Sequence, residues 1–151
     1  EMLRSLVGSE MCIRDRMERL AQVTYQEREA AVLALGIHLL CELWDCDRQA
    51  LNRRRYLVRA LAQAVRAAGG TLLGIKSHAF KPHGVSAVAL LGESHMSIHT
   101  WPELGYAAVD IFTCGPSMDP YRGLELLKEA VGARRMAVQE VRRGPGSGPP
   151  A

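Results

Sequence analysis

The spacing of hydrophobic residues changes along the chain between two patterns, and each pattern predicts a different kind of element. Short apolar runs bounded by glycine, proline or aspartate are typical of buried strands, whereas apolar residues three and four positions apart mark one face of a helix. The runs predict strands over residues 36–46, 71–80, 85–91, 95–101, 106–114 and 136–142.

Two segments have helical spacing instead. The first helix is expected to be capped by Asp45 or Asp47 and to end at the Gly-Gly pair 69–70. Its apolar face is formed by Leu57, Leu61, Val65 and Ala68. The second helix begins at Asp119, an N-cap followed by proline. Its buried stripe is formed by Leu124, Leu127 and Val131.

The order of these elements indicates an α+β fold. We expect a two-layer sandwich in which an antiparallel sheet carries both helices on one face. The opposite face then needs a cover, because a strand as apolar as 85–91 is typical of a sheet that is buried on both sides. A second copy of the same sheet is the simplest cover. We therefore expect a homodimer with four layers, αββα.

Length and composition favour a single domain. A chain of 151 residues that is 48% hydrophobic and 23% charged suits one globular domain, which we expect over 17–143. Residues 1–16 are expected to be a non-native leader, because 3–16 resemble a translated sequencing adapter and Met17 can serve as the start. Residues 144–151 are rich in glycine and proline and are expected to form a disordered tail.

Charge and cysteine usage narrow the choice of partners and compartment. The net charge of +3 is spread along the chain, so neither nucleic acid nor an anionic membrane surface is expected. Arginines of the first helix lack interleaved aromatic residues and are expected to form a solvated face. The four cysteines form no CxxC pair and we find no secretory leader, which favours the cytoplasm. No run approaches the roughly 20 apolar residues of a membrane helix.

Reactive side chains concentrate in residues 92–103 and suggest three kinds of site. A metal site would pair His95 with His99, but four residues of extended chain separate them by about 13 Å, whereas zinc ligands lie about 2 Å from the ion. We therefore expect no metal. A serine hydrolase would need a Gly-x-Ser-x-Gly turn that leads into a helix, which 92–96 lacks. Self-processing is the third possibility.

Self-processing is suggested by a resemblance. The segment GESHMSIHTWPELGYAAVDIFTCG (92–115), preceded by FKPHGVS (80–86), is similar to the hallmark region of the prokaryotic S-adenosylmethionine decarboxylase proenzymes. The similarity extends from about residue 36 to about residue 143. Members of that family cut themselves before a serine and convert this serine into a pyruvoyl cofactor. The resemblance implies a decarboxylase of S-adenosylmethionine that supplies the aminopropyl donor for polyamine (spermidine) synthesis.

The resemblance assigns a role to each reacting residue. The cleaved bond joins Glu93 to Ser94. Ser94 Oγ attacks the Glu93 carbonyl to form an ester, and loss of the Ser94 Cα proton then expels the upstream carboxylate. Ser86 and His99 assist processing, and Cys114 donates a proton after decarboxylation. Without the resemblance, these last three residues would be read as a strand serine, a hydrogen-bonded histidine and a buried thiol.

Strand pairing constrains which residues can act together. A loop at 102–105 places Cys114 one step from Ser94 in the neighbouring strand. Ser86 instead pairs near residue 99 or 100, far from the turn of its own chain. We therefore expect Cys114 to act in cis, and Ser86 and His99 to serve the serine of the partner chain. The active sites would then be shared between protomers.

The resemblance also assigns contacts with the substrate. Phe80 and Trp101 would lie near the adenine and the sulfonium, where flat aromatic faces suit stacking and a cation. Glu103 would accept hydrogen bonds from the ribose hydroxyls. Gly92 and Ala79 depart from the family pattern, in which serine and arginine are common. Because some relatives decarboxylate arginine or ornithine, those two substrates are the alternative, and an unprocessed, non-catalytic homologue is a further one.

Overall fold

The structure, a computed structural model, describes residues 34–145, so the predicted leader 1–16 and residues 146–151 of the predicted tail lie outside the described part. Residues Leu35–Arg143 form one compact unit. Its elements are β1 (Gly36–Trp44), α2 (Arg48–Leu51), α3 (Arg54–Ala67), β2 (Leu72–Ala79), β3 (Val85–Leu91), β4 (Ser94–Trp101), η1 (Pro102–Leu104), β5 (Tyr106–Cys114), α4 (Pro120–Ala130) and β6 (Arg135–Arg143).

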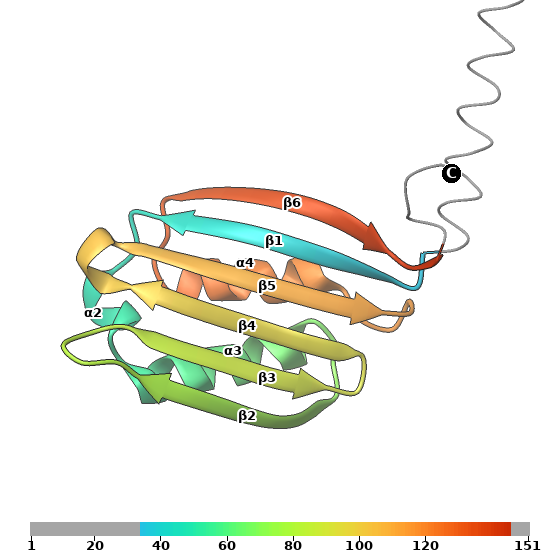
Figure 1. Cartoon of the computed structure of the whole chain (residues 1–151), viewed down its shortest axis with the longest axis horizontal. Helices are drawn as coiled ribbons and strands as arrows, with labels where there is room; N and C mark the ends of the chain where they lie inside the picture. Colours follow the sequence, from blue (N-terminus) through green and yellow to red (C-terminus); the bar gives the residue numbers. More distant parts are fainter. Residues whose placement is uncertain (1–33, 146–151) are drawn as a thin grey trace, which may run out of the picture. The chain divides into compact units, whose positions relative to one another are not determined.

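The six strands form one antiparallel sheet in the order β2-β3-β4-β5-β1-β6. The first strand in the sequence, β1, is therefore bordered by β5 on one side and β6 on the other. Both long helices, α3 and α4, lie on the same face of this sheet (Figure 1). The predicted α+β fold with its helices on one face is confirmed.

The start of the first helical segment differs from the prediction. Asp47 caps only the short α2, because its side chain accepts hydrogen bonds from the backbone N–H groups of Gln49 and Ala50. The chain then breaks, and α3 begins at Arg54 without a side-chain cap. Asp45 caps no helix and pairs with Arg135 at 2.6 Å. The predicted cap at Asp119 is confirmed, because its side chain accepts from the Tyr121 N–H.

The core lies between the sheet and the two long helices. Its largest side chains, each less than 2% exposed, include Leu39 and Leu43 of β1, Leu57 and Leu61 of α3, and Leu124 and Leu127 of α4. Burying one such side chain stabilises a fold by about 1.5–3 kcal/mol. The alternation of buried and exposed residues along β3 and β5 sends every second side chain into this core. The remaining side chains of the two strands point to the face opposite the helices.

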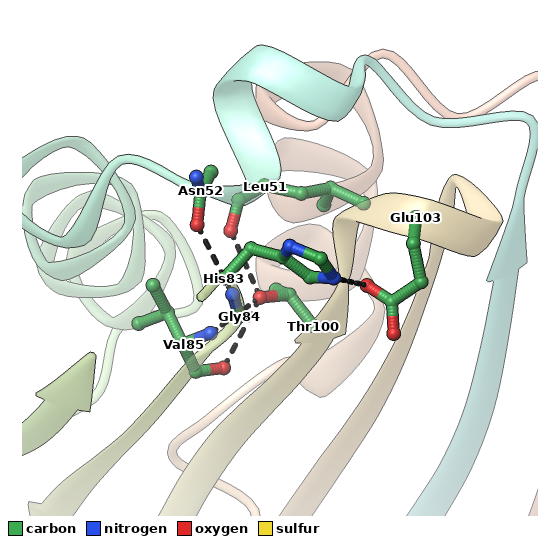
Figure 2. Close-up of polar contacts among 7 residues, drawn as sticks. All are labelled: Leu51, Asn52, His83, Gly84, Val85, Thr100 and Glu103. Atoms are coloured by element: carbon green, nitrogen blue, oxygen red, sulfur yellow. Dashed lines mark hydrogen bonds and ion pairs between the residues drawn. The ribbon is translucent and has the colours of Figure 1, made fainter. Parts of the chain in front are cut away.

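The end of α2 anchors the turn between β2 and β3 (Figure 2). The Gly84 N–H donates to Asn52 Oδ1 at 3.0 Å, and the Val85 N–H donates to Thr100 Oγ1 at 2.9 Å. The Thr100 hydroxyl in turn donates to the Leu51 carbonyl at 2.8 Å. These bonds satisfy a buried hydroxyl and connect the ends of β3 and β4 to the helical layer.

Candidate active site

The predicted cleavage bond lies in the turn between β3 and β4. Ser94 is the first residue of β4 and pairs with Thr113 of β5, as the predicted register requires. Its φ is 152°, a positive value that is uncommon for a residue with a side chain and costs about 1–3 kcal/mol. The Glu93 carbonyl accepts a hydrogen bond from the Cys114 N–H at 3.0 Å. A strained serine therefore follows a carbonyl that already has a backbone donor.

The same turn is tied to the residue before β2. The Gly92 N–H donates to the Thr71 carbonyl at 2.9 Å. The Thr71 N–H donates in return to Glu93 Oε2, also at 2.9 Å. Hydrogen bonds from Thr71 lower the pKa of Glu93 below its usual value of 4.5. Glu93 is therefore ionised at neutral pH.

His95 is a site residue that sequence reasoning missed. Its Nδ1 lies 3.3 Å from Ser94 Oγ. In a regular strand, neighbouring side chains point to opposite faces, so adjacency in the sequence argues against such a contact. The positive φ of Ser94 brings the two side chains together. The sequence carried no signal for that backbone distortion.

Ser86 and His99 form the second polar pair among the predicted residues. They oppose each other on β3 and β4, and Ser86 Oγ lies 2.7 Å from His99 Nδ1. His99 lies five positions after Ser94 on β4, which corresponds to about 17 Å along the strand. The structure therefore brings Ser86 and His99 together but keeps them away from the serine of their own chain.

Cys114 lies beside the cleavage turn and is exposed, whereas Cys41 and Cys46 are buried. Burial raises the pKa of Cys41 to about 12 and that of Cys46 to about 11, so both remain thiols. Gly36 of β1 packs directly against the end of β5. A Cβ at this glycine would lie 2.4 Å from the Thr113 carbonyl oxygen and 3.1 Å from Cys114 Sγ. Glycine therefore lets β1 approach the predicted proton donor.

The predicted substrate-binding residues gather at the opposite end of β4. Trp101 ends this strand, is 40% exposed, and lies beside Tyr106 with ring centroids 5.3 Å apart. Glu103 of η1 pairs with His83 Nε2 at 3.1 Å (Figure 2). Phe80 follows β2 and is 51% exposed. Trp101 lies seven positions after Ser94, a distance of about 23 Å along the strand.

The sheet face opposite the helices carries a polar network that the sequence did not reveal. The Ser97 hydroxyl donates to Asp110 Oδ2 at 3.1 Å, and His38 Nε2 lies 3.7 Å from Asp110 Oδ1. Burial is the main cause that lowers the pKa of His38. The Tyr106 hydroxyl donates to Glu42. Burial and this carboxylate raise the pKa of Tyr106 to about 12.

Two hollows in the surface lie away from these residues. One of about 560 Å³ is lined by Ala67, Tyr121, Arg122, Glu125, Leu126 and Glu129. Another of about 430 Å³ is lined by Arg54, Arg55, Val58, Arg59 and Ser77. None of the predicted site residues lines either hollow. Within residues 34–145, no group of three or more His, Cys, Asp and Glu side chains could hold a metal ion. None of the helices described there is long and apolar enough to cross a membrane.

Comparison with known proteins identifies the family. The model of the S-adenosylmethionine decarboxylase family matches residues 37–144. The S-adenosylmethionine decarboxylase proenzyme of Methanococcus aeolicus is 46% identical over 110 residues, which cover 73% of this chain and 94% of the relative. The proenzyme of Prochlorococcus marinus is 48% identical over 109 residues, covering 72% and 87%.

A solved structure agrees with these relatives. The crystal structure of the adenosylmethionine decarboxylase from Aquifex aeolicus is similar with a TM-score of 0.70 and 37% identity. The similarity covers 74% of this chain and 92% of that structure. Because the family model and the relatives cover most of the described part, this chain belongs to the S-adenosylmethionine decarboxylase family.

Proposed function

We propose that this chain is a self-processing, pyruvoyl-dependent S-adenosylmethionine decarboxylase that serves polyamine synthesis. The observation that carries the proposal is the Glu93–Ser94 bond, where a backbone-strained serine follows a carbonyl that is hydrogen-bonded to the Cys114 N–H. Cleavage would divide the chain into a β chain that ends at Glu93 and an α chain that begins at Ser94. The two relatives named above are proenzymes.

The residues around this bond fit the formation of a pyruvoyl group. Attack by Ser94 Oγ on the Glu93 carbonyl requires a proton acceptor, and His95 Nδ1 is the ring nitrogen within 3.3 Å of that oxygen. The Cys114 N–H is aimed at the carbonyl oxygen that would gain negative charge. The ester forms as the C–N bond breaks, and loss of the Ser94 Cα proton releases the Glu93 carboxylate and leaves dehydroalanine. Dehydroalanine rearranges to an imine, which water hydrolyses to the pyruvoyl group with release of ammonia.

Once formed, the pyruvoyl group would supply a carbonyl that condenses with the substrate amine and accepts the electrons left by carbon dioxide. Cys114 is our candidate for returning a proton to the substrate Cα, because its thiol is exposed beside the cleavage turn. Phe80, Trp101 and Glu103 remain our candidates for adenine, sulfonium and ribose. Their exposed aromatic faces and carboxylate suit these three groups.

We also propose that the working site forms between two copies of this chain. His99 lies about 17 Å along β4 from Ser94 of its own chain. Ser86 pairs with His99 from the neighbouring strand β3. The sheet face that carries them is not covered by the described helices, and it holds exposed apolar side chains such as Val88 (41%) and Leu90 (59%). A second copy of this face would bury them and would bring Ser86 and His99 to the partner's serine. Sedimentation that shows only monomer at micromolar concentration would contradict the homodimer.

The three cysteines among the described residues are free thiols, which supports a reducing compartment and hence the cytoplasm as the proposed location. The central experiment is mass spectrometry of the denatured protein. We expect the 16.6 kDa chain to be replaced by two fragments divided before Ser94. Ser94→Ala should stay intact and inactive.

Carbon dioxide release from S-adenosylmethionine, arginine and ornithine then identifies the substrate. We expect release from S-adenosylmethionine alone. A chain that remains intact after expression would contradict self-processing and would indicate a non-catalytic homologue. A cleaved chain that acts only on arginine or ornithine would contradict the proposed substrate.

A further inference from the structure

The cleavage turn is held from outside by a residue distant in the sequence. Thr71 precedes β2, yet its backbone makes both hydrogen bonds of a reciprocal pair with the turn. Its carbonyl accepts from the Gly92 N–H, and its N–H donates to the Glu93 carboxylate, each at 2.9 Å. Both partners of Thr71 therefore lie on the two residues before the serine.

Two hydrogen bonds hold the residue that carries the scissile carbonyl, one at its side chain and one at its carbonyl oxygen. The side chain of Glu93 is fixed to Thr71, and its carbonyl oxygen is fixed to the Cys114 N–H at 3.0 Å. Rotation of the peptide between Glu93 and Ser94 would break one of the two bonds. Since reaction rates depend steeply on the alignment of the attacked carbonyl, a restriction of this kind favours attack by Ser94.

The hydrogen bond from the Thr71 N–H to Glu93 is of a strong kind. A backbone N–H that donates to an ionised carboxylate makes a stronger hydrogen bond than one that donates to a neutral acceptor. The lowered pKa of Glu93 keeps the carboxylate ionised in neutral solution. Gly92 leaves room for this approach, because a Cβ there would lie 3.3 Å from Thr71 Cβ.

We propose that the Glu93 carboxylate is a positioning residue for self-cleavage, which it assists by clamping the turn to the Thr71 N–H so that the Glu93 carbonyl stays on the Cys114 N–H. This inference rests on the proposed function, since it assigns a task to the side chain of a residue whose backbone is cut. Nothing in the cleavage chemistry itself requires a carboxylate at this position. The clamp supplies the reason for one.

The first test compares cleavage rates of the freshly made chain and its variants by denaturing mass spectrometry. Glu93→Ala removes the acceptor and should slow cleavage by about tenfold or more. Glu93→Gln keeps a neutral acceptor for the Thr71 N–H, so its cleavage rate should lie between the rates of Glu93→Ala and the parent. Glu125→Ala removes a carboxylate of α4 that pairs with Lys128 at 3.0 Å, far from the turn in sequence. This control should cleave at the parent rate.

Thermal unfolding separates positioning from general stability. In the Ser94→Ala background, where no chain is cut, melting temperatures with and without each Glu93 substitution should match, because the contact lies at the surface. If the parent cleaves and Glu93→Ala cleaves at the same rate, the clamp is overturned and the proposed function stays intact. A parent chain that never cleaves would overturn both.

A second measurement observes the clamp without any cleavage. In uncut Ser94→Ala, the amide proton of Thr71 should shift in NMR spectra as Glu93 titrates, with a midpoint below 4.5 because the hydrogen bond favours the ionised carboxylate. The shift should be absent in the double variant that carries both Ser94→Ala and Glu93→Gln. A Thr71 amide signal that does not respond to pH would overturn the clamp, whatever the cleavage rates.

Discussion

The two ends of β4 carry different halves of the proposed active site. The first end, at Ser94, has a strained backbone, the bond that we propose is cut, and the Glu93 carbonyl that accepts from the Cys114 N–H. The last end, at Trp101, has exposed aromatic side chains and the Glu103 carboxylate. About 23 Å of extended strand separates the two ends. A straight strand cannot bring them together, so one chain holds both halves without joining them.

Residues that are close in the sequence need not share one reaction centre. Residues 92–103 read as one cluster, yet a strand spreads them along the sheet at about 3.3 Å per residue. Ser86 and His99 lie between the two ends, paired with each other at 2.7 Å. We expect a second copy, not a bend in the strand, to unite the halves.

The largest effect is expected from mixing two inactive variants. His99→Ala should not process as a homodimer, and Ser94→Ala cannot. In a mixed dimer, the His99→Ala chain supplies the serine and the Ser94→Ala chain supplies the histidine, so one complete site forms. Co-expression should therefore restore cleavage of the His99→Ala chain, measured by mass spectrometry. Failure of the mixture to cleave, with mixed dimers verified, would place both residues in one chain.

The next effect concerns the first end of β4 alone. Cys114→Ala retains the backbone N–H on the Glu93 carbonyl, so cleavage should proceed. Turnover should fall by about a hundredfold or more, because the variant lacks the proposed proton donor. Cleavage and turnover are measured on the same preparation. Normal turnover of the cleaved variant would remove Cys114 from the proton-donor role.

A smaller effect is expected from crowding the same end. A Cβ at Gly36 would lie 2.4 Å from the Thr113 carbonyl oxygen, so Gly36→Ala must displace β1 from the end of β5. We expect the variant to lose about 1–3 kcal/mol of unfolding free energy, measured by denaturant titration. Gly74→Ala is the matched control, since its Cβ would meet nothing within 4 Å. Equal stability of the two variants would contradict the close approach.

The smallest effect belongs to the last end. His83→Ala removes the partner of Glu103 without touching the cleavage turn. Exposed pairs of this kind are worth about 0–1 kcal/mol, so KM for S-adenosylmethionine should rise by no more than about fivefold. The rate of self-cleavage should not change. A slower cleavage in this variant would show that the two ends are coupled within one chain.

Much of the architecture could be predicted from local patterns. Alternating apolar runs located the strands, and the short connection at 102–105 set the register in which Ser94 pairs with Thr113. The pairing of Ser86 with His99 was one of the two expected options. Such inferences succeed because a tight hairpin fixes the pairing of its two strands. The roles of these residues in catalysis stay predictions.

Two missed features depend on contacts that no local pattern encodes. Thr71 reaches the cleavage turn through its backbone, 22 positions from Glu93, and a backbone contact leaves no mark in residue type. His95 reaches Ser94 only because the serine departs from strand geometry. The cap at Asp47 was anticipated, but the break between α2 and α3 was not. The polar run at residues 52–55 interrupts the apolar spacing between Leu51 and Leu57, and this signal was overlooked.

The position of β1 in the sheet has a consequence for the cut protein. Cleavage before Ser94 would assign β1, β2 and β3 to one fragment and β4, β5 and β6 to the other. Because β1 lies between β5 and β6, strands of the two fragments would alternate in one sheet. The fragments would pair along three borders, β3 with β4, β5 with β1, and β1 with β6. The cut protein would elute from gel filtration at the same volume as the uncut protein, and its two fragments would separate only in denaturant. Such an interlocked pair is readily made by folding first and cutting afterwards.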